Sequence, residues 1–329
     1  MSKSTKMKKI FIFLPILAIG FWWFYVPSLT SLPDSQFNSS LIRKQIGNSI
    51  RITGAAKTYD QVKNRLSTVD NARQHSVAHI FGELLYTIEG LEGISVCDSS
   101  FGFGCYHSFF GRAISEKGES IVKELDKVCV DSYGPMGLGC PHGIGHGLGE
   151  YFGPEKIDRQ LEICDSLTWK GRFLGCKGGV FMEYYTPIVT ENDTVTTTVR
   201  PYEQANPYGV CPRVEPKFQP ACFLELTGWW ERVLEKDYTN IGKLCDSITD
   251  PINRESCLLG VGYAAVQSNG YDIEQSMDIC KTMPDDDSIM LCRAGASWSF
   301  FANPQFRDQS KKVCEGSVLC EQKSDLLAY

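Results

Sequence analysis

The sequence predicts an all-α fold, an α-solenoid of disulfide-linked helical hairpins with a period near 35 residues, preceded by one transmembrane helix. Three observations predict it. Fourteen cysteines fall into seven successive pairs, the second cysteine of each pair recurs at an almost constant interval, and the N-terminal segment holds a long uncharged apolar run. With 329 residues and 43% hydrophobic content, the chain is long enough to bury a large core.

Residues 1–33 are expected to contain a short cytoplasmic segment with lysines, followed by a membrane anchor. The apolar run 10–26 is 17 residues long, the short end for a transmembrane helix. Lysines before the run favour a cytoplasmic N-terminus, and the aromatic residues near its end suit the outer interface: Trp22, Trp23 and Tyr25. The alternative is a cleaved signal peptide, although no clear small-x-small cleavage site follows. We therefore expect a single-pass protein of the cytoplasmic membrane, a linker at 34–58, and the bulk of the chain on the extracytoplasmic side.

The helical-repeat domain is expected at 59–329, and its cysteines define the repeat. An even number of cysteines in an exported chain indicates a disulfide framework. From Cys105 to Cys292, the second members are separated by 35, 36, 46, 35 and 35 residues. The pairs are Cys97 and Cys105, Cys129 and Cys140, Cys164 and Cys176, Cys211 and Cys222, Cys245 and Cys257, Cys280 and Cys292, and Cys314 and Cys320.

Each repeat begins with an amphipathic helix that ends at the first cysteine. In "PEKIDRQLEIC", Ile157, Leu161 and Cys164 follow helical spacing behind a proline that suits the first turn. A loop of about ten residues leads to the second cysteine, where another helix is expected. The third residue after that cysteine is small in every unit except one, so neighbouring helices can approach closely: Ser108, Gly143, Gly179, Gly260 and Gly295, with Glu225 as the exception. Helical spacing from Tyr59 onward predicts a capping hairpin.

Disulfides are expected between successive cysteines, because the end of one helix and the start of the next antiparallel helix are neighbours. Spacing alone leaves the connectivity open. The alternative is a set of zinc sites built from Cys105 with His107 and Cys140 with His142. The same cysteine pairs persist in later units that lack histidine, which favours disulfides.

About eleven extra residues interrupt the repeat between Cys176 and Cys211, within an insertion at 186–207. Its alternating "TVTTTV" follows a turn-forming "END", which predicts a small hairpin or an ordered loop. Such an insertion either covers the concave face of the solenoid as a lid or is a tolerated surface feature.

The period and the cysteine and glycine pattern over residues 73–320 resemble the tetratricopeptide and Sel1-like class of helical repeats, particularly its disulfide-bonded secreted members. The chain departs from that pattern in one respect. The paired cysteines here span a longer loop instead of tying together the two helices of one repeat. The resemblance implies a curved solenoid with a concave face for a protein partner, and it implies no activity.

All five histidines occupy two equivalent positions of the repeat. His107 and His142 lie two residues after the second cysteine of their units, and His146 lies six after it. Extending the register one unit backward places His75 and His79 at the same two positions. Glu83 and Glu150 both lie at the tenth position, so His-x3-His-x3-Glu occurs twice.

Residues four apart share a helix face, so these side chains are expected to converge on one wall of the solenoid. Imidazole with carboxylate suits a transition metal ion such as zinc, iron or copper. We expect the five histidines as metal ligands and the two glutamates as ligands or proton carriers. Two arrangements fit this pattern. In the first, one ion binds at His107, His142 and His146. In the second, two ions bind with His107 between them. The alternative is that the histidines fill space at helix contacts.

The composition and motifs exclude several function classes. A formal charge of −6 without a clustered basic face argues against a nucleic-acid partner. No nucleophile elbow, phosphate-binding loop or dinucleotide fingerprint is present. The sequence thus predicts a membrane-anchored metal-binding repeat protein, either a metal-dependent oxidoreductase or hydrolase or a metal-binding subunit. The alternative function is a non-enzymatic scaffold for protein–protein interaction.

Overall fold

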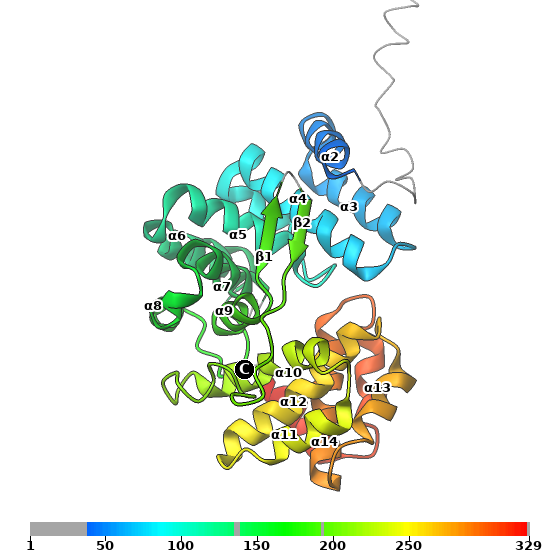
Figure 1. The fold of residues 1–329 in the computed structure, drawn as a ribbon. Helices are drawn as coiled ribbons and strands as arrows, with labels where there is room; N and C mark the ends of the chain where they lie inside the picture. The colour runs from blue at the N-terminus through cyan, green and yellow to red at the C-terminus, as the bar shows by residue number, and fades with distance from the viewer. Residues whose placement is uncertain (1–37, 135–138, 192–193, 328–329) are drawn as a thin grey trace, which may run out of the picture.

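The computed structural model describes residues 38–134, 139–191 and 194–327, which are almost entirely helical (Figure 1). The longer helices of the N-terminal half are α2 (Ser39–Thr53), α3 (Ala55–Leu66), α4 (Asn71–Glu89), α5 (Gly104–Lys117), α6 (Val122–Tyr133), α7 (Gly139–Phe152), α8 (Ile157–Ser166) and α9 (Cys176–Tyr185). The hairpin strands are β1 (Ile188–Glu191) and β2 (Thr194–Thr197). The C-terminal half holds α10 (Gln219–Val233), α11 (Tyr238–Asp246), α12 (Pro251–Ser268), α13 (Ile273–Cys280), α14 (Asp286–Ala302), α15 (Ser310–Val313) and α16 (Val318–Leu327). Short 3-10 turns lie at Gly90–Val96, Glu119–Ile121, Pro154–Lys156 and Arg307–Gln309.

The helices that carry the second cysteines pack against one another in chain order. Contacts join α4 to α5, α5 to α7, α7 to α9, α9 to α10, α10 to α12, and α12 to α14. The shorter helices α6, α8, α11 and α13 pack beside this row, each against its chain neighbours. The order follows the chain, as helical repeats require.

Aspartates begin several of the C-terminal helices. The side chains of Asp237, Asp250, Asp272 and Asp285 each accept a hydrogen bond from a backbone amide in the first turn of the helix that follows. This satisfies amides that have no partner within the helix.

Seven disulfides join successive cysteines, which confirms the pairing that the spacing predicted. Six of them link the end of a helix or 3-10 turn to the start or first turns of the next helix, and Cys211–Cys222 joins the loop before α10 to the first turn of α10. The Cα–Cα distances are 5.3–5.6 Å. No cysteine of the described residues is free. The proposed Cys-x-His zinc sites are therefore wrong, because both sulfur atoms that they need are in disulfides.

Glycines at equivalent repeat positions let the backbones of neighbouring helices touch. A Cβ atom on Gly145 of α7 would overlap the Cys176 carbonyl oxygen of α9, and one on Gly179 would overlap the His142 carbonyl oxygen. Gly262 and Gly295 make the same reciprocal contact between α12 and α14. Such approach is reserved for glycine and permits Cα–H···O contacts between helices.

The insertion forms the hairpin that the sequence predicted. Strands β1 and β2 pair antiparallel, with Ile188 opposite Thr197 and Glu191 opposite Thr194. Strand β2 contacts α4, so the hairpin reaches back from the end of α9 to an early repeat (Figure 1).

The predicted linker at 34–58 is wrong from residue 39 onward. Helix α2 occupies Ser39–Thr53, with Ile42, Ile46 and Ile50 buried on one face. Asn38 is the N-cap of this helix, and its side chain accepts a hydrogen bond from the Leu41 amide. The predicted anchor lies within residues 1–37, outside the described part of the chain. Among the described helices, none has the length and apolar character needed to cross a bilayer.

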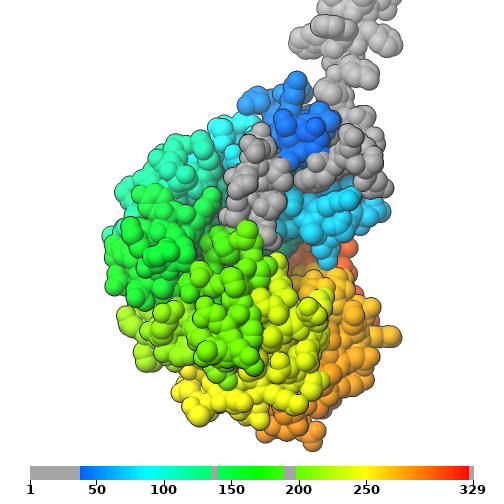
Figure 2. Space-filling model, viewed as in Figure 1, coloured from blue at the N-terminus to red at the C-terminus, as the bar shows by residue number. Residues whose placement is uncertain are grey.

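The two ends of the row lie close together. In Figure 2 the chain runs round the molecule from the blue N-terminal helices to the orange C-terminal region, which adjoin each other at the right. Residues 67–76 and residues 303–306 line the same cavity. Both halves of the chain therefore line the interior of the row.

We expect Gly262→Ala to lower the free energy of unfolding by about 1–3 kcal/mol, because the new methyl group would force α12 and α14 apart. Gly228→Ala is the matched control in α10. Its methyl group would meet only Ala264, at 4.0 Å, and alanine favours the helix. Denaturant unfolding of the two variants measures the difference. Equal stabilities would contradict the role assigned to the glycine contact.

Candidate metal centre

Three adjacent helices bring the five histidines together. His75 and His79 lie on α4, His107 on α5, and His142 and His146 on α7. Among the described residues, two triads have ligand atoms within 4.8 Å of one another: His75, His79 and His107 form the first triad, and His107, His142 and His146 form the second. These triads can hold a metal ion, and His107 belongs to both.

Ring nitrogens face one another at short range in the first triad. His79 Nε2 lies 2.9 Å from His75 Nε2 and 3.3 Å from His107 Nδ1. The ring centroids of this triad are 4.5–5.3 Å apart.

The second triad has one pair of ring nitrogens at short range. His142 Nε2 and His146 Nε2 are 3.2 Å apart. The ring of His107 lies over that of His146, with centroids 4.0 Å apart, and its centroid is 5.4 Å from that of His142.

Hydrogen bonds on the far side of each ring set the orientation of the nitrogens that converge. His75 Nδ1 donates to the Phe101 carbonyl at 2.7 Å, and His146 Nδ1 lies 2.9 Å from Glu183 Oε2. His79 Nδ1 is 2.8 Å from Ser108 Oγ. Outer partners of this kind typically orient metal-binding imidazoles.

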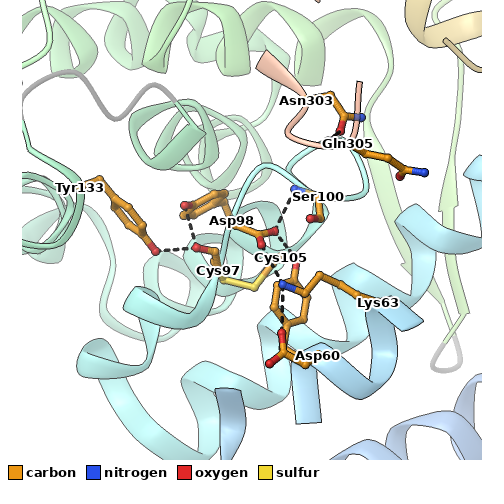
Figure 3. Close-up of polar contacts among 11 residues, drawn as sticks. Asp60, Lys63, Cys97, Asp98, Ser100, Cys105, Tyr133, Asn303 and Gln305 are labelled. Atoms are coloured by element: carbon orange, nitrogen blue, oxygen red, sulfur yellow. Dashed lines mark hydrogen bonds and ion pairs between the residues drawn. A yellow bond between two sulfur atoms is a disulfide. The ribbon is translucent and has the colours of Figure 1, made fainter. Parts of the chain in front are cut away.

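A tightly held loop presents the Phe101 carbonyl to His75. The Cys97–Cys105 disulfide closes the loop, and Asp98 binds Lys63 at 3.1 Å and the Ser100 amide at 2.9 Å (Figure 3). Phe101 and Phe103 have φ values of 57° and 64°, a left-handed conformation that is costly for bulky residues. The loop therefore maintains strain to place one carbonyl oxygen.

Burial lowers the pKa of all five histidines. The pKa of His146 falls to about 3, first because of burial and then because of the charge that His75 would carry. The cluster is consequently neutral at pH 7, and neutral imidazole is the form that binds metal.

The two glutamates of the His-x3-His-x3-Glu pattern do not join either triad of the described residues. Glu83 forms an ion pair with Arg43 at 2.8 Å. Glu150 extends over Gly111 of α5 and is exposed as a whole residue. Burial of its carboxylate and the nearby charges of Glu183 and Glu83 raise the pKa of Glu150 to about 7. Their predicted role as ligands or proton carriers stays a prediction.

Two other carboxylates approach the histidines, and the sequence analysis did not identify their role. Glu183 of α9 is 5% exposed as a side chain and bonds His146. Glu225 of α10 occupies the one repeat position where a small residue is missing, and its Oε1 is buried without a hydrogen-bond partner among the described residues. A Cβ atom on Gly178 would lie 2.8 Å from Glu225 Oε1 and 3.5 Å from His142 Nδ1, so both groups border the same glycine. In the sequence, a glutamate at a repeat position that is otherwise small was the observation that could have identified Glu225 as a site residue.

All five histidines line a cavity of about 1530 Å³. Its opposite wall comes from α10, α12 and the loop after α14, and includes Glu225, Trp229, Tyr263 and Phe306. Asn303 and Gln305 of that loop lie near Ser100 at the rim (Figure 3). The cavity is large enough for a small-molecule ligand beside the histidines.

Comparisons with known proteins assign no family to the chain. No family model, curated protein or solved structure matches it. The function must therefore be inferred from the site itself.

We expect Glu225→Gln to stabilise the metal-free protein more at pH 8 than at pH 6. Burial raises the pKa of Glu225 to about 8, so the folded chain keeps a proton that the unfolded chain loses above its ordinary pKa. Between the ordinary pKa and the raised one, each pH unit lowers the free energy of unfolding of wild type by about 1.4 kcal/mol. The extra stability of the variant over wild type should therefore grow by about 2 kcal/mol from pH 6 to pH 8. Urea unfolding at the two pH values measures it.

The exposed residue Glu315 provides the control. Glu315→Gln should change stability equally at both pH values. A Glu225→Gln advantage that does not grow with pH would show that the carboxyl group already ionises in the folded protein.

Proposed function

We propose that this chain is a membrane-anchored, extracytoplasmic metal-binding protein in which the histidine cluster binds a transition metal ion. The observation that carries the proposal is the spacing of the inner nitrogens. Two nitrogens bound to one zinc ion at about 2.0–2.1 Å lie about 3.3 Å apart in tetrahedral geometry and about 2.9 Å apart at a right angle. The three nitrogen pairs of the cluster are separated by 2.9, 3.2 and 3.3 Å.

The hydrogen bond outside the second triad supports the same conclusion. An ionised Glu183 accepts from His146 Nδ1, which places the proton of His146 on that nitrogen. The lone pair of His146 Nε2 then points toward His142, 3.2 Å away, where it can bind a metal ion.

The choice of metal follows from the ligand type. Imidazole nitrogens suit zinc, copper, iron and nickel, and the described cluster offers no thiolate because its cysteines are in disulfides. A centre with three histidines leaves a coordination position for water or a substrate, and such a position is used in hydrolytic and oxygen chemistry. The cavity beside the rings supports a metal-dependent oxidoreductase or hydrolase over a purely structural ion.

The setting of the site is also part of the proposal. Seven disulfides fit an oxidising compartment outside the cytosol, and the apolar N-terminal run would attach the chain to the membrane. The sequential helix packing supports an α-solenoid of the Sel1-like or tetratricopeptide type. A protein partner on its concave face is the alternative use of this architecture.

We expect the purified chain to hold a stoichiometric transition metal, and His142→Ala/His146→Ala to lose at least half of it. The double substitution removes two of the three ligands of the second triad. Elemental analysis by mass spectrometry after purification without chelator measures the content of zinc, copper, iron and nickel.

Asn253→Ala is the control, because Asn253 is a buried polar residue of α12 that does not line the cavity. It should retain the metal content of wild type. A wild-type protein that stays metal-free after growth with all four metals would instead favour histidines that fill space in a protein-binding scaffold.

A further inference from the structure

His107 lies at the centre of the cluster and is shared by both triads. Its Nδ1 faces the first triad, 3.3 Å from His79 Nε2. Its Nε2 is buried and has no hydrogen-bond partner among the described residues. Leaving a buried nitrogen unsatisfied is unfavourable, because the group has lost its hydrogen bonds to water. The position of this ring therefore requires an explanation that uses both of its nitrogens.

One ion does not reach all five histidines in this arrangement. Ligands of a single zinc ion, each at about 2.0–2.1 Å, lie within about 4.2 Å of one another. The described histidines meet a 4.8 Å limit only as two groups of three, never as one group of four or five. The two groups have one member in common, His107.

We propose that the cluster binds two transition metal ions joined by the imidazolate of His107. His75, His79 and His107 Nδ1 hold the first ion, and His142, His146 and His107 Nε2 hold the second. This inference rests on the proposed function, because it specifies how many ions the same site holds and how they are linked.

The bridge forms by loss of one proton. A neutral imidazole has one N–H bond and one lone pair, so it can bind only one ion without reaction. When the second ion binds, the remaining N–H bond of His107 breaks, a nitrogen–metal bond forms, and the proton leaves through the cavity to solvent. The ions keep their oxidation state.

Three carboxyl groups lie around the cluster and can balance the charge of two cations once they are ionised. Glu183 bonds His146, Glu150 lies within electrostatic range of Glu183, and Glu225 borders Gly178 beside His142. Glu225 and Glu183 are buried, and Glu183 bonds His146. Buried charges need compensation, and two divalent ions would provide it.

Copper(II) is the probe that tests the bridge. The full-length chain, stripped of metal, is titrated with copper(II), and bound copper is counted beside the electron paramagnetic resonance signal. We expect two copper ions per chain and a signal well below that of two independent spins, because an imidazolate couples two copper(II) centres antiferromagnetically.

Variants on either side of the bridge should respond alike. His75→Ala should bind one copper at the second triad, and His142→Ala one copper at the first, each with the full signal of one spin. His107→Ala should lower the affinity of both sites at least tenfold and abolish the coupling. The two outer variants keep the test decisive even when His107→Ala does not fold.

The outcomes separate this inference from the proposed function. Two coupled ions support it. One ion per wild-type chain, or two ions with the full signal of two spins, overturns the bridge and leaves a metal-binding protein. Absence of tight copper binding overturns both.

Discussion

Direct backbone contact between neighbouring helices is the constraint on which the rest of the structure depends. Gly145 and Gly179 let α7 and α9 touch, and Gly143 lets α7 approach Tyr106 of α5. A methyl group at these positions would overlap a backbone or side-chain atom of the next helix. Because His107 and His142 each lie one residue before the small residue of their own repeat, the same contact draws their rings together.

The disulfides and the close helices act on different parts of each repeat. Each disulfide fixes how one helix leads into the next, and the glycine contact fixes how far apart the inward-facing sides lie. Together they set the spacing of the helix backbones that carry the imidazoles. The outer hydrogen bonds to Phe101, Ser108 and Glu183 then select which nitrogen of His75, His79 and His146 points inward.

Repetition made much of this site predictable from the sequence. A fixed register predicted the seven disulfides and placed His107 beside both His75 and His142, although they are far apart in the chain. The register could not predict contacts made by residues outside the repeated positions. Glu183 reaches His146 from a repeat without histidine, and Arg43 of an unexpected helix pairs with Glu83. The carboxylate position of the repeated motif therefore lies outside the triads, and a different glutamate contacts the histidines.

Crystals of the metal-loaded protein, measured at the absorption edge of the bound metal, test the central claim most directly. The account predicts anomalous scattering peaks within the histidine cluster, one among the nitrogens of His75, His79 and His107 and one among those of His107, His142 and His146. Anomalous peaks confined to the protein surface, with the five rings hydrogen-bonded only to protein groups, would contradict it.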